Sequence, residues 1–583
     1  MPQNRTIPTG NHPDIVTLTV KSGGSVIDST IEVNMVSVVK EFGRIPAAKL
    51  VVLDGDPASE TFSVSNRDIF IPGKEIEILS GYHAHESSIF KGIVVKNSIK
   101  IRANGQSVLI VEARDKAFKM TLSRHSKYFY EAKDSQAWQE LIEQYGLSTS
   151  IETTGITFQE LVQFDATDWD FVVSRAELNG MLVNADAGKI EIKKPDVSAS
   201  PLFDLTFGST IRELDAEMDA RLQTMAVEAK SWDPAAQETN SVEGNNPNIR
   251  LNGNLNPGTL AQAAGAEKIE LRHTGNLTTP ELQSWADAWW MRHQLAKIRG
   301  RVKFQGVATP VPGVLLNLTG VGDRFNGPVF VTGVKHTIAD GDWETDVQFG
   351  LDPDWFLEKI PLQSSIYSGG RANTFSGLQI GIVTQLENDP SGENRILVRL
   401  PAIDPNGQGV WSRFAAPDAG NNRGVYFRPE IGDEVVVGFL NGDKHHPVVL
   451  GGLHSSSNPA PIAESDDNHE KGVVTRSEMK MIFNDEKSSF TLSTPAGKSF
   501  VLDDDAGLVE LKDENGNKIT MDSNGIVIES PAKIKIKATQ DLELEGMNSS
   551  VKAQLQFKAE GSAGAEVSSN GAAVLRGSIV QIN

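Results

Sequence analysis

The side chains best suited to hold a metal ion are two histidine pairs and one run of aspartates. His83 and His85 would present two imidazoles on one side of an extended chain, but no third ligand is evident near them. His445 and His446 are adjacent, so on a strand they would point to opposite faces. Residues 503–505 are all Asp but lack the spacing of a calcium loop. We therefore expect polar loops at the histidine pairs and no bound metal.

Catalytic signatures are missing in the same way. The chain has no cysteine, which excludes disulfides, thiolate metal sites and cysteine nucleophiles. It has no Gly-rich phosphate loop of the Walker type and no Ser-His-Asp signature. Pairs of Asp and Glu are frequent, but none lies on a recognisable catalytic scaffold, and solvated faces explain them. We expect no catalytic residue and no cofactor, and thus a protein that is not an enzyme.

Length and charge narrow the class of protein further. A chain of 583 residues is too long for one core and suggests about four domains. The net charge of −21 argues against a nucleic-acid binder and against a polybasic membrane-surface protein. Residues 1–14 lack the apolar core of a signal peptide, and no run is long enough for a membrane helix. We expect synthesis in the cytoplasm without a signal peptide.

The elements that position these residues are mostly β-strands, and they are most regular in the tail, residues 499–583. Ile534 and Ile536 alternate there with Lys533 and Lys535, which is typical of a strand with one wet and one buried face. The same alternation continues to Phe557. Its main apolar positions are Ile534, Ile536, Leu542, Leu544, Leu555 and Phe557.

Turn signals in the tail recur with a fixed period. Residues 504–507, 513–516 and 522–525 each begin with Asp and end with Gly, nine residues after the previous start. A repeat of one strand and one turn cannot bury its own apolar face. The pattern fits either an ordinary antiparallel meander or a fibrous β-structure built from several chains. We favour the fibrous structure, because the tail lacks the bulky residues of a globular core.

The pattern of the front of the chain indicates β-domains with helices between them. Residues 14–130 and 300–349 have the pattern of β-domains, and residues 181–235 also have β character. Residues 233–275 are rich in Asn, Gly and Ala and indicate a long loop or insertion.

Three helices are expected in this front region. Asp134 would cap the first, which runs through Gln144, and Thr167 would cap the second. Thr279 would cap the third, with a proline at the first helical position and an end near Ile298. This third helix carries three tryptophans, which suit either a ligand platform or packing. We favour packing for Trp285, Trp289 and Trp290, because aromatic stripes on helices are usually core.

A compact module with five short strands follows a Ser/Gly-rich linker. Five strands in about 80 residues is the size of a small barrel such as an OB-fold. A second linker separates this module from the tail. The linkers are residues 361–376 and 455–470, and the strands are expected at 380–385, 395–400, 409–414, 434–440 and 447–450.

This module and the front of the chain carry the motifs of a known family. The module resembles the OB-fold of VgrG-type spikes and phage baseplate needle proteins. Its motifs are Asn388-Asp389-Pro390, Arg395 to Pro401, Trp411-Ser412-Arg413, and Pro429 to Glu434. The run Asp168-Trp169-Asp170-Phe171, followed by Arg175, Glu177 and Gly180, is similar to the tail-hub signature of the same proteins. Residues 468–477 look most like spikes of extracellular contractile injection systems, while type VI secretion and phage tails remain open.

The resemblance implies a mainly β fold with a few helices. It comprises two hub β-barrels, an OB-fold and a C-terminal intertwined triple-stranded β-helix, a prism made by three chains. The expected boundaries are a hub at 1–360, the OB-fold at 377–454 and a needle at 471–583, with the two linkers between them. The implied partners are two identical chains, a hexameric inner tube and baseplate proteins, a PAAR-type tip protein and an effector cargo, with no nucleic acid.

The function implied is that of a central spike which sheath contraction drives through a target membrane. The particle would be released or fired outside the producing cell. The six apolar positions of the tail would then face the trimer axis, and the tip would end at Ile579, Val580 and Ile582. The alternative is a trimeric adhesin or polysaccharide-binding tail protein, which would need exposed aromatic clefts. A cell-wall hydrolase does not fit, because the gap between Leu453 and Lys480 is too short for such a domain.

Overall fold

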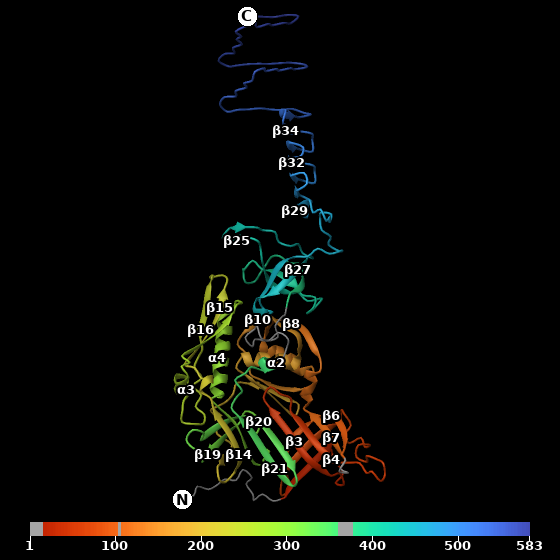
Figure 1. The fold of residues 1–583 in the computed structure, drawn as a ribbon, viewed down its shortest axis with the longest axis vertical. Coiled ribbons are helices and arrows are strands. Elements are labelled where there is room, and N and C mark those ends of the chain that lie inside the picture. Colours follow the sequence, from red (N-terminus) through yellow and green to blue (C-terminus); the bar gives the residue numbers. More distant parts are fainter. Residues whose placement is uncertain (1–14, 103–106, 360–376, 583) are drawn as a thin grey trace. The chain divides into compact units, whose positions relative to one another are not determined.

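The computed structural model describes residues 15–102, 107–359 and 377–582. The chain divides into two compact units, Met1–Asn458 and Pro459–Asn583 (Figure 1). The described residues are mainly β with a few helices, as the sequence predicts. None of the helices in these residues is both long and apolar enough to cross a membrane. The predicted linker at 361–376 lies outside the described residues.

A 13-stranded sheet forms the base of the first unit. Its path is β14-β18-β21-β20-β3-β4-β7-β6-β5-β1-β2, and β19 joins β20 and pairs with β13. The strands of its N-terminal half are β1 (Val16–Ser22), β2 (Ser25–Val26), β3 (Val33–Glu41), β4 (Ala47–Leu53), β5 (Glu75–Tyr82), β6 (His85–Ile101) and β7 (Ser107–Arg114). Those of the second half are β13 (Asp204–Thr206), β14 (Ile211–Met218), β18 (Ile298–Gln305), β19 (Leu315–Thr319), β20 (Gly327–Ala339) and β21 (Asp342–Phe349).

The two predicted hub barrels correspond to the two halves of this sheet. Each half has its own apolar core, one around Leu50 and Ile78 and the other around Val302 and Phe349. The halves are joined because β3 pairs with β20 in antiparallel register. Among the described strands, neither half is closed into a barrel, and the closed barrel is the one formed by residues 379–452.

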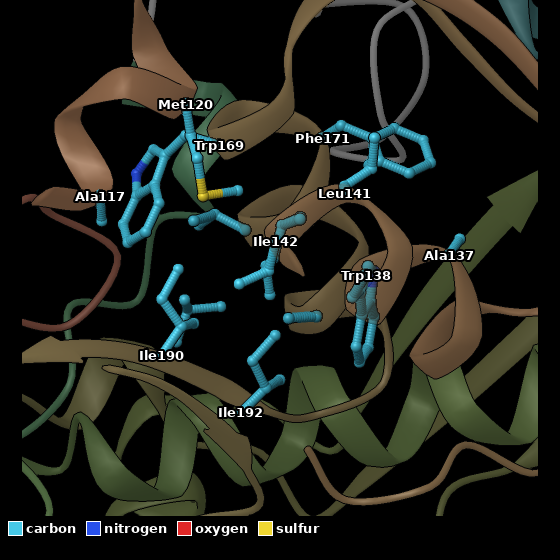
Figure 2. Packing of buried hydrophobic residues seen from close by; sticks show 14 of the residues in the cluster. Ala117, Met120, Ala137, Trp138, Leu141, Ile142, Trp169, Phe171, Ile190 and Ile192 are labelled. Atoms are coloured by element: carbon cyan, nitrogen blue, oxygen red, sulfur yellow. The ribbon is translucent and has the colours of Figure 1, made fainter. Parts of the chain in front are cut away.

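Between these halves in sequence, the chain forms a smaller helical layer. Helices α1 (Asp134–Glu143) and α2 (Asp168–Leu178) share one core with the short strands around them. Figure 2 shows Trp138 and Leu141 of α1, Trp169 and Phe171 of α2, and Ile190 and Ile192 of β12 around this core. The strands are β8 (Arg124–Lys133), β9 (Ser148–Ile151), β10 (Thr157–Thr167), β11 (Leu182–Asp186) and β12 (Lys189–Lys193).

The predicted helix caps are right once and wrong by one residue twice. The Thr167 hydroxyl accepts from the Asp170 amide, as expected for the cap of α2. Helix α1 begins at Asp134 itself, and its cap is Lys133. Helix α4 (Thr279–Leu295) is capped by Thr278, because Glu281 reaches back to the Thr278 amide in a capping box.

Residues 233–275 are predicted to be a long loop or an insertion, and the loop alternative is wrong because they contain regular structure. Strand β15 (Ala226–Asp233) pairs antiparallel with β16 (Glu238–Glu243) and parallel with β17 (Lys268–His273). Helix α3 (Pro257–Ala264) lies between the last two strands in sequence. The polar and small residues of this segment show no clear hydrophobic period. Packing against α4 determines its fold.

The tryptophans of α4 pack, as predicted. Trp285 and Trp290 are buried in the core between α4 and this small sheet. Trp289 is only partly buried, and its ring stacks on the ring of His293 with 3.5 Å between centroids.

The predicted OB module is a closed five-stranded barrel in the order β22-β23-β24-β28-β27. Every predicted strand is confirmed to within two residues at each end. The strands are β22 (Gln379–Gln385), β23 (Ile396–Arg399), β24 (Val410–Phe414), β27 (Glu434–Phe439) and β28 (Pro447–Gly452), with a small hairpin of β25 (Ala419–Gly420) and β26 (Arg423–Gly424). Gly381 is required in β22, because a Cβ there would lie 2.4 Å from the Val398 side chain.

The second unit begins as an antiparallel meander. Its strands are β29 (Glu470–Val474), β30 (Lys480–Asn484), β31 (Ser489–Ser493), β32 (Ser499–Asp503), β33 (Leu508–Lys512), β34 (Lys518–Asp522) and β35 (Gly525–Glu529). The three predicted turns separate its last strands, and Gly507, Gly516 and Gly525 all have positive φ. Within one chain, residues 470–529 therefore adopt the meander, the alternative that we did not favour.

The described residues beyond Glu529 form no strand. The alternating segments between Lys533 and Phe557 are extended passes with no strand partner in the same chain (Figure 1). The prediction of strands here is wrong for a single chain. Alternation selects two faces, but a β-ladder also needs a neighbouring backbone to exchange hydrogen bonds.

The tail-hub signature forms a buried polar network that holds the helices in place. Asp168 is fully buried, and its carboxylate accepts from the Tyr145 hydroxyl at 2.6 Å and from the Gln144 amide at 2.7 Å. The Gln163 amide donates at 2.7 Å, and His125 Nδ1 lies 3.0 Å away. A carboxylate with this many partners is satisfied without any ligand.

Two ion pairs extend the network from α2 to its neighbours. Arg175 donates to both carboxylate oxygens of Asp134 in α1, at 2.7 and 2.9 Å, and both side chains are buried. Glu177 accepts from Arg292 of α4 and from the backbone amide of Phe356, which begins α5 (Phe356–Lys359). The signature residues therefore fix helix positions.

The Asp134–Arg175 pair gives a test of this structural role. Asp134→Asn leaves a buried guanidinium without its charge partner, which costs about 3–5 kcal/mol. We expect the first thermal unfolding transition of the full chain to shift down clearly. The control is Glu140→Gln, which breaks the exposed pair with Lys127 and costs at most about 1 kcal/mol. Equal shifts in the two variants would contradict a structural role for the buried pair.

Candidate functional site

One face of the meander is apolar from β30 to β35. Paired residues on neighbouring strands lie on the same face of a sheet, as do alternate residues of one strand. The register therefore aligns two rows of side chains on this face. The first row is Met481, Leu492, Phe500, Leu511, Ile519 and Ile528, and the second is Phe483, Phe490, Leu502, Val509, Met521 and Ile526.

This apolar face is largely exposed in the single chain. Leu511 is 53% exposed and Ile526 is 68% exposed. A groove of about 440 Å³ runs over the first row, lined by Leu492, Phe500 and Leu511 among others. Contiguous apolar patches of this kind on a folded protein mark an interaction surface. The central row of the opposite face is mixed, with Thr491, Val501, Glu510 and Thr520.

The residues predicted to form the needle interior are not brought together by one chain. The side chains of Ile534, Ile536, Leu542, Leu544, Leu555 and Phe557 are all exposed, as are the predicted tip residues Ile579, Val580 and Ile582. Their orientation toward a shared axis stays a prediction. Another chain beside these extended passes would bury them.

The OB-fold also carries individual exposed apolar side chains. Tyr426 is 80% exposed and Ile431 is 64% exposed, and Leu378 and Leu450 are also more than half exposed. The Arg428 guanidinium lies 5.7 Å from the centre of the Tyr426 ring, a cation–π contact at the surface.

The OB barrel also packs against the hub strands β8 and β10. Tyr128 and Val162 from these strands belong to the same core as the barrel residues, and the Gly409 amide donates to the Tyr130 hydroxyl at 3.3 Å. Glu160 of β10 lies in this junction, and burial raises its pKa to about 7 despite a hydrogen bond from the Trp411 amide. The junction therefore contains an acid that titrates near neutral pH.

A cluster of histidines lies between β17 and the OB barrel. His273 Nε2 is 3.2 Å from one carboxylate oxygen of Asp443, and His445 Nδ1 is 2.8 Å from the other. His446 completes the group. Burial alone would raise the pKa of Asp443, but the neighbouring imidazoles hold it well below its ordinary value.

No spacing in the sequence indicates this cluster, since His273 is far from the others along the chain. His445 and His446 both precede β28 in a loop, as expected. The polar loop expected at His83 and His85 is confirmed at His83, where the chain reverses. His83 and Ala84 both have positive φ and form the two-residue turn between β5 and β6.

Three family profiles match the chain, in the order of its domains. Residues 12–340 match the Alg8 N-terminal domain, which is more than half of the chain. Residues 379–454 match the type VI secretion system/phage-baseplate injector OB domain. Residues 489–545 match the phage baseplate V C-terminal trimerisation domain.

Curated relatives are spike proteins of type VI secretion systems. The spike protein VgrG1c of Pseudomonas aeruginosa is 22% identical over 474 residues, which cover 75% of this chain and 62% of that protein. VgrG3 of Vibrio cholerae is 40% identical over 68 residues, 12% of this chain and 6% of that protein. The chain thus spans less than two thirds of the length of these relatives.

Solved structures support the fold. The lidded Francisella PdpA-VgrG complex includes a chain that aligns with a TM-score of 0.53 at 11% identity, covering 85% of this chain and 80% of that one. The lidless complex aligns with a TM-score of 0.52, covering 88% and 98%.

The apolar face of the meander predicts association that a single charge disrupts. Leu511→Asp places a carboxylate in the middle of the first apolar row, so we expect the full chain to lose its oligomer in size-exclusion chromatography with light scattering. Glu510→Gln, on the same strand but the opposite face, is the matched control and should keep the wild-type mass. Wild-type mass for both variants would show that this face is not an interface.

The Glu160 carboxyl predicts a pH dependence of stability. Its folded pKa of about 7 lies above the ordinary value of 4.5, so its contribution is complete below about pH 4.5 and lost as the pH rises through 7. We expect Glu160→Gln to be more stable than the wild type at pH 8, with this difference shrinking toward pH 5. The measurement is the melting temperature across that range, with Glu140→Gln as control. Parallel curves of melting temperature against pH for the wild type and both variants would contradict the raised pKa of Glu160.

Proposed function

We propose that this chain is the central spike of a contractile injection apparatus. The premise is that the chain belongs to the family defined by the Alg8 N-terminal domain and is a VgrG-type spike protein. The spike would sit at the tip of the inner tube and pass through the target envelope when the sheath contracts. The work comes from contraction elsewhere, and this chain transmits the force. The observation that carries the proposal is the exposed apolar face of residues 481–528.

Three identical chains are the simplest occupants of that face. The trimerisation profile covers residues 489–545, which include most of the apolar rows. Fully burying one Leu, Ile or Phe side chain contributes about 1.5–3 kcal/mol, so two rows of such residues in each chain supply a large driving force. In the trimer, Ile534, Ile536, Leu542, Leu544, Leu555 and Phe557 would line the axis.

An intertwined prism also resolves the backbone problem of residues 530–582. These residues have no strand partner in their own chain. Neighbouring chains would supply the missing ladder and leave no open sheet edge. The result is a stiff rod, which is what penetration requires.

The partners follow from this arrangement. The hub, residues 1–360, would bind the hexameric inner tube and baseplate, and the needle, residues 471–583, would carry a PAAR-type tip protein beyond Ile582. Effector cargo would travel with the spike, and contact with the target membrane would be transient. The complete particle would act outside the producing cell. The role is mechanical and requires no catalysis by this chain.

The needle interior is tested by Ile536→Asp, which places a charge at the proposed axis. We expect loss of the native trimer mass and of injection into target cells. Lys535→Asp is the matched control, because its side chain lies on the outward face and should keep both. A trimeric, injection-competent Ile536→Asp spike would contradict the proposed axis.

Binding to purified hexameric tube protein separates the spike from a trimeric adhesin. A spike binds the tube and needs no glycan. A protein that binds surface polysaccharide but no tube would overturn the proposal.

A further inference from the structure

We propose that His273, Asp443 and His446 bind one divalent transition-metal ion of the Zn²⁺ class. One nitrogen or oxygen atom from each of the three side chains lies within 4.8 Å of the other two. Two imidazoles and one carboxylate are ligands that zinc accepts, whereas calcium and magnesium prefer oxygen ligands alone. This site is independent of the spike's mechanical role.

The spacing of the ligand atoms fits a bound ion. His273 Nε2 and Asp443 Oδ2 are 3.2 Å apart. Two ligands that bind a tetrahedral ion at about 2.0 Å are separated by roughly 3.3 Å. The rings of His273 and His446 are tilted by 55° with centroids 5.5 Å apart, so they do not stack in parallel. Small side-chain rotations would bring the third ligand into range.

The other atoms of the ligands are held by the surrounding chain. Asp443 Oδ1 accepts from the His445 amide at 3.0 Å and lies 2.8 Å from His445 Nδ1, so Oδ2 is the oxygen left for the ion. His273 Nδ1 lies 3.0 Å from the Gly275 amide nitrogen and 3.4 Å from its carbonyl oxygen. Such outer contacts orient the ligands of metal sites in proteins.

A buried nitrogen atom without a partner points independently to a ligand. Nε2 of His446 is buried and makes no hydrogen bond. Nε2 of His273, which is 4% exposed as a residue, lies 3.2 Å from the Asp443 carboxylate. Buried polar atoms in folded proteins are normally paired, and exceptions call for a physical reason such as an unobserved ion. An ion at this position would give the buried Nε2 of His446 a partner.

Gly275 provides the space for the third ligand. A Cβ at this residue would lie 2.2 Å from Cδ2 of the His446 ring, which is far inside contact distance. The ring therefore packs directly on the backbone beside His273. Any side chain at residue 275 would push His446 away from the other two ligands without altering a ligand itself.

The consequence of the site is a cross-link between distant parts of the chain. His273 ends β17, whereas Asp443 and His446 lie in the loop before β28 of the OB barrel. A bound ion would therefore tie the inserted sheet of the hub to the barrel. Metal that binds the folded state alone stabilises it by mass action.

The test uses the full chain without a histidine tag, stripped by a chelator and desalted. On addition of ZnCl₂ we expect one ion per chain by elemental analysis and a higher melting temperature. Co²⁺ should give the intense visible absorption of a four-coordinate site with nitrogen ligands. His273→Gln and His446→Gln should weaken Zn²⁺ binding more than about 100-fold, beyond the 10–100-fold typical of outer-contact changes.

Two further variants separate ligation from folding. Gly275→Ala keeps every ligand and should lose the Co²⁺ spectrum, whereas the control His83→Gln/His85→Gln should bind as the wild type does. His445→Gln should weaken binding by about 10–100-fold while keeping one ion per chain. The proposal is overturned if the wild type binds no ion, or if the His273→Gln/His446→Gln double variant keeps the wild-type stoichiometry.

Discussion

The structure depends on one constraint, which is that the tail's apolar face cannot be buried by its own chain. The meander is a single sheet with two faces, and among the described residues of this unit its apolar face stays largely exposed. Each strand of the meander pairs only with its neighbours in sequence, so the sheet does not close on itself. Burial must therefore come from other chains, so stability of the tail and association are the same event.

The first unit, by contrast, buries its apolar residues within its own chain. Its sheet carries separate cores on its two halves, and helices α1, α2 and α4 are fixed by ion pairs that leave little freedom. The OB barrel shares a core with β8 and β10, so force or strain on the barrel reaches the hub through packed side chains. A rigid base and a tail completed by its partners suit a device that bears load.

The sequence predicted best where local pattern and local structure agree. The OB strands follow directly from alternation and turn residues, and so do the turns ending at Gly507 and Gly516. It predicted poorly where partners are distant: the sheet at 226–273 depends on packing against α4, and the two misplaced caps depend on side chains a few residues away. The His273–Asp443 contact joins residues 170 positions apart, a relation that no spacing rule detects.

In the tail, the sequence of one chain does not determine the strand pairing. Between Lys533 and Phe557 the alternation is as regular as in β32 or β33, yet only the latter are paired. The difference lies in the turns: the Asp-to-Gly signals stop after Gly525, and without a tight reversal the next segment cannot return beside the last. A segment that keeps the alternation of polar and apolar residues but lacks tight turns needs strand partners from other chains in place of partners from its own. The point where the turns end is thus where a meander becomes a structure shared among chains.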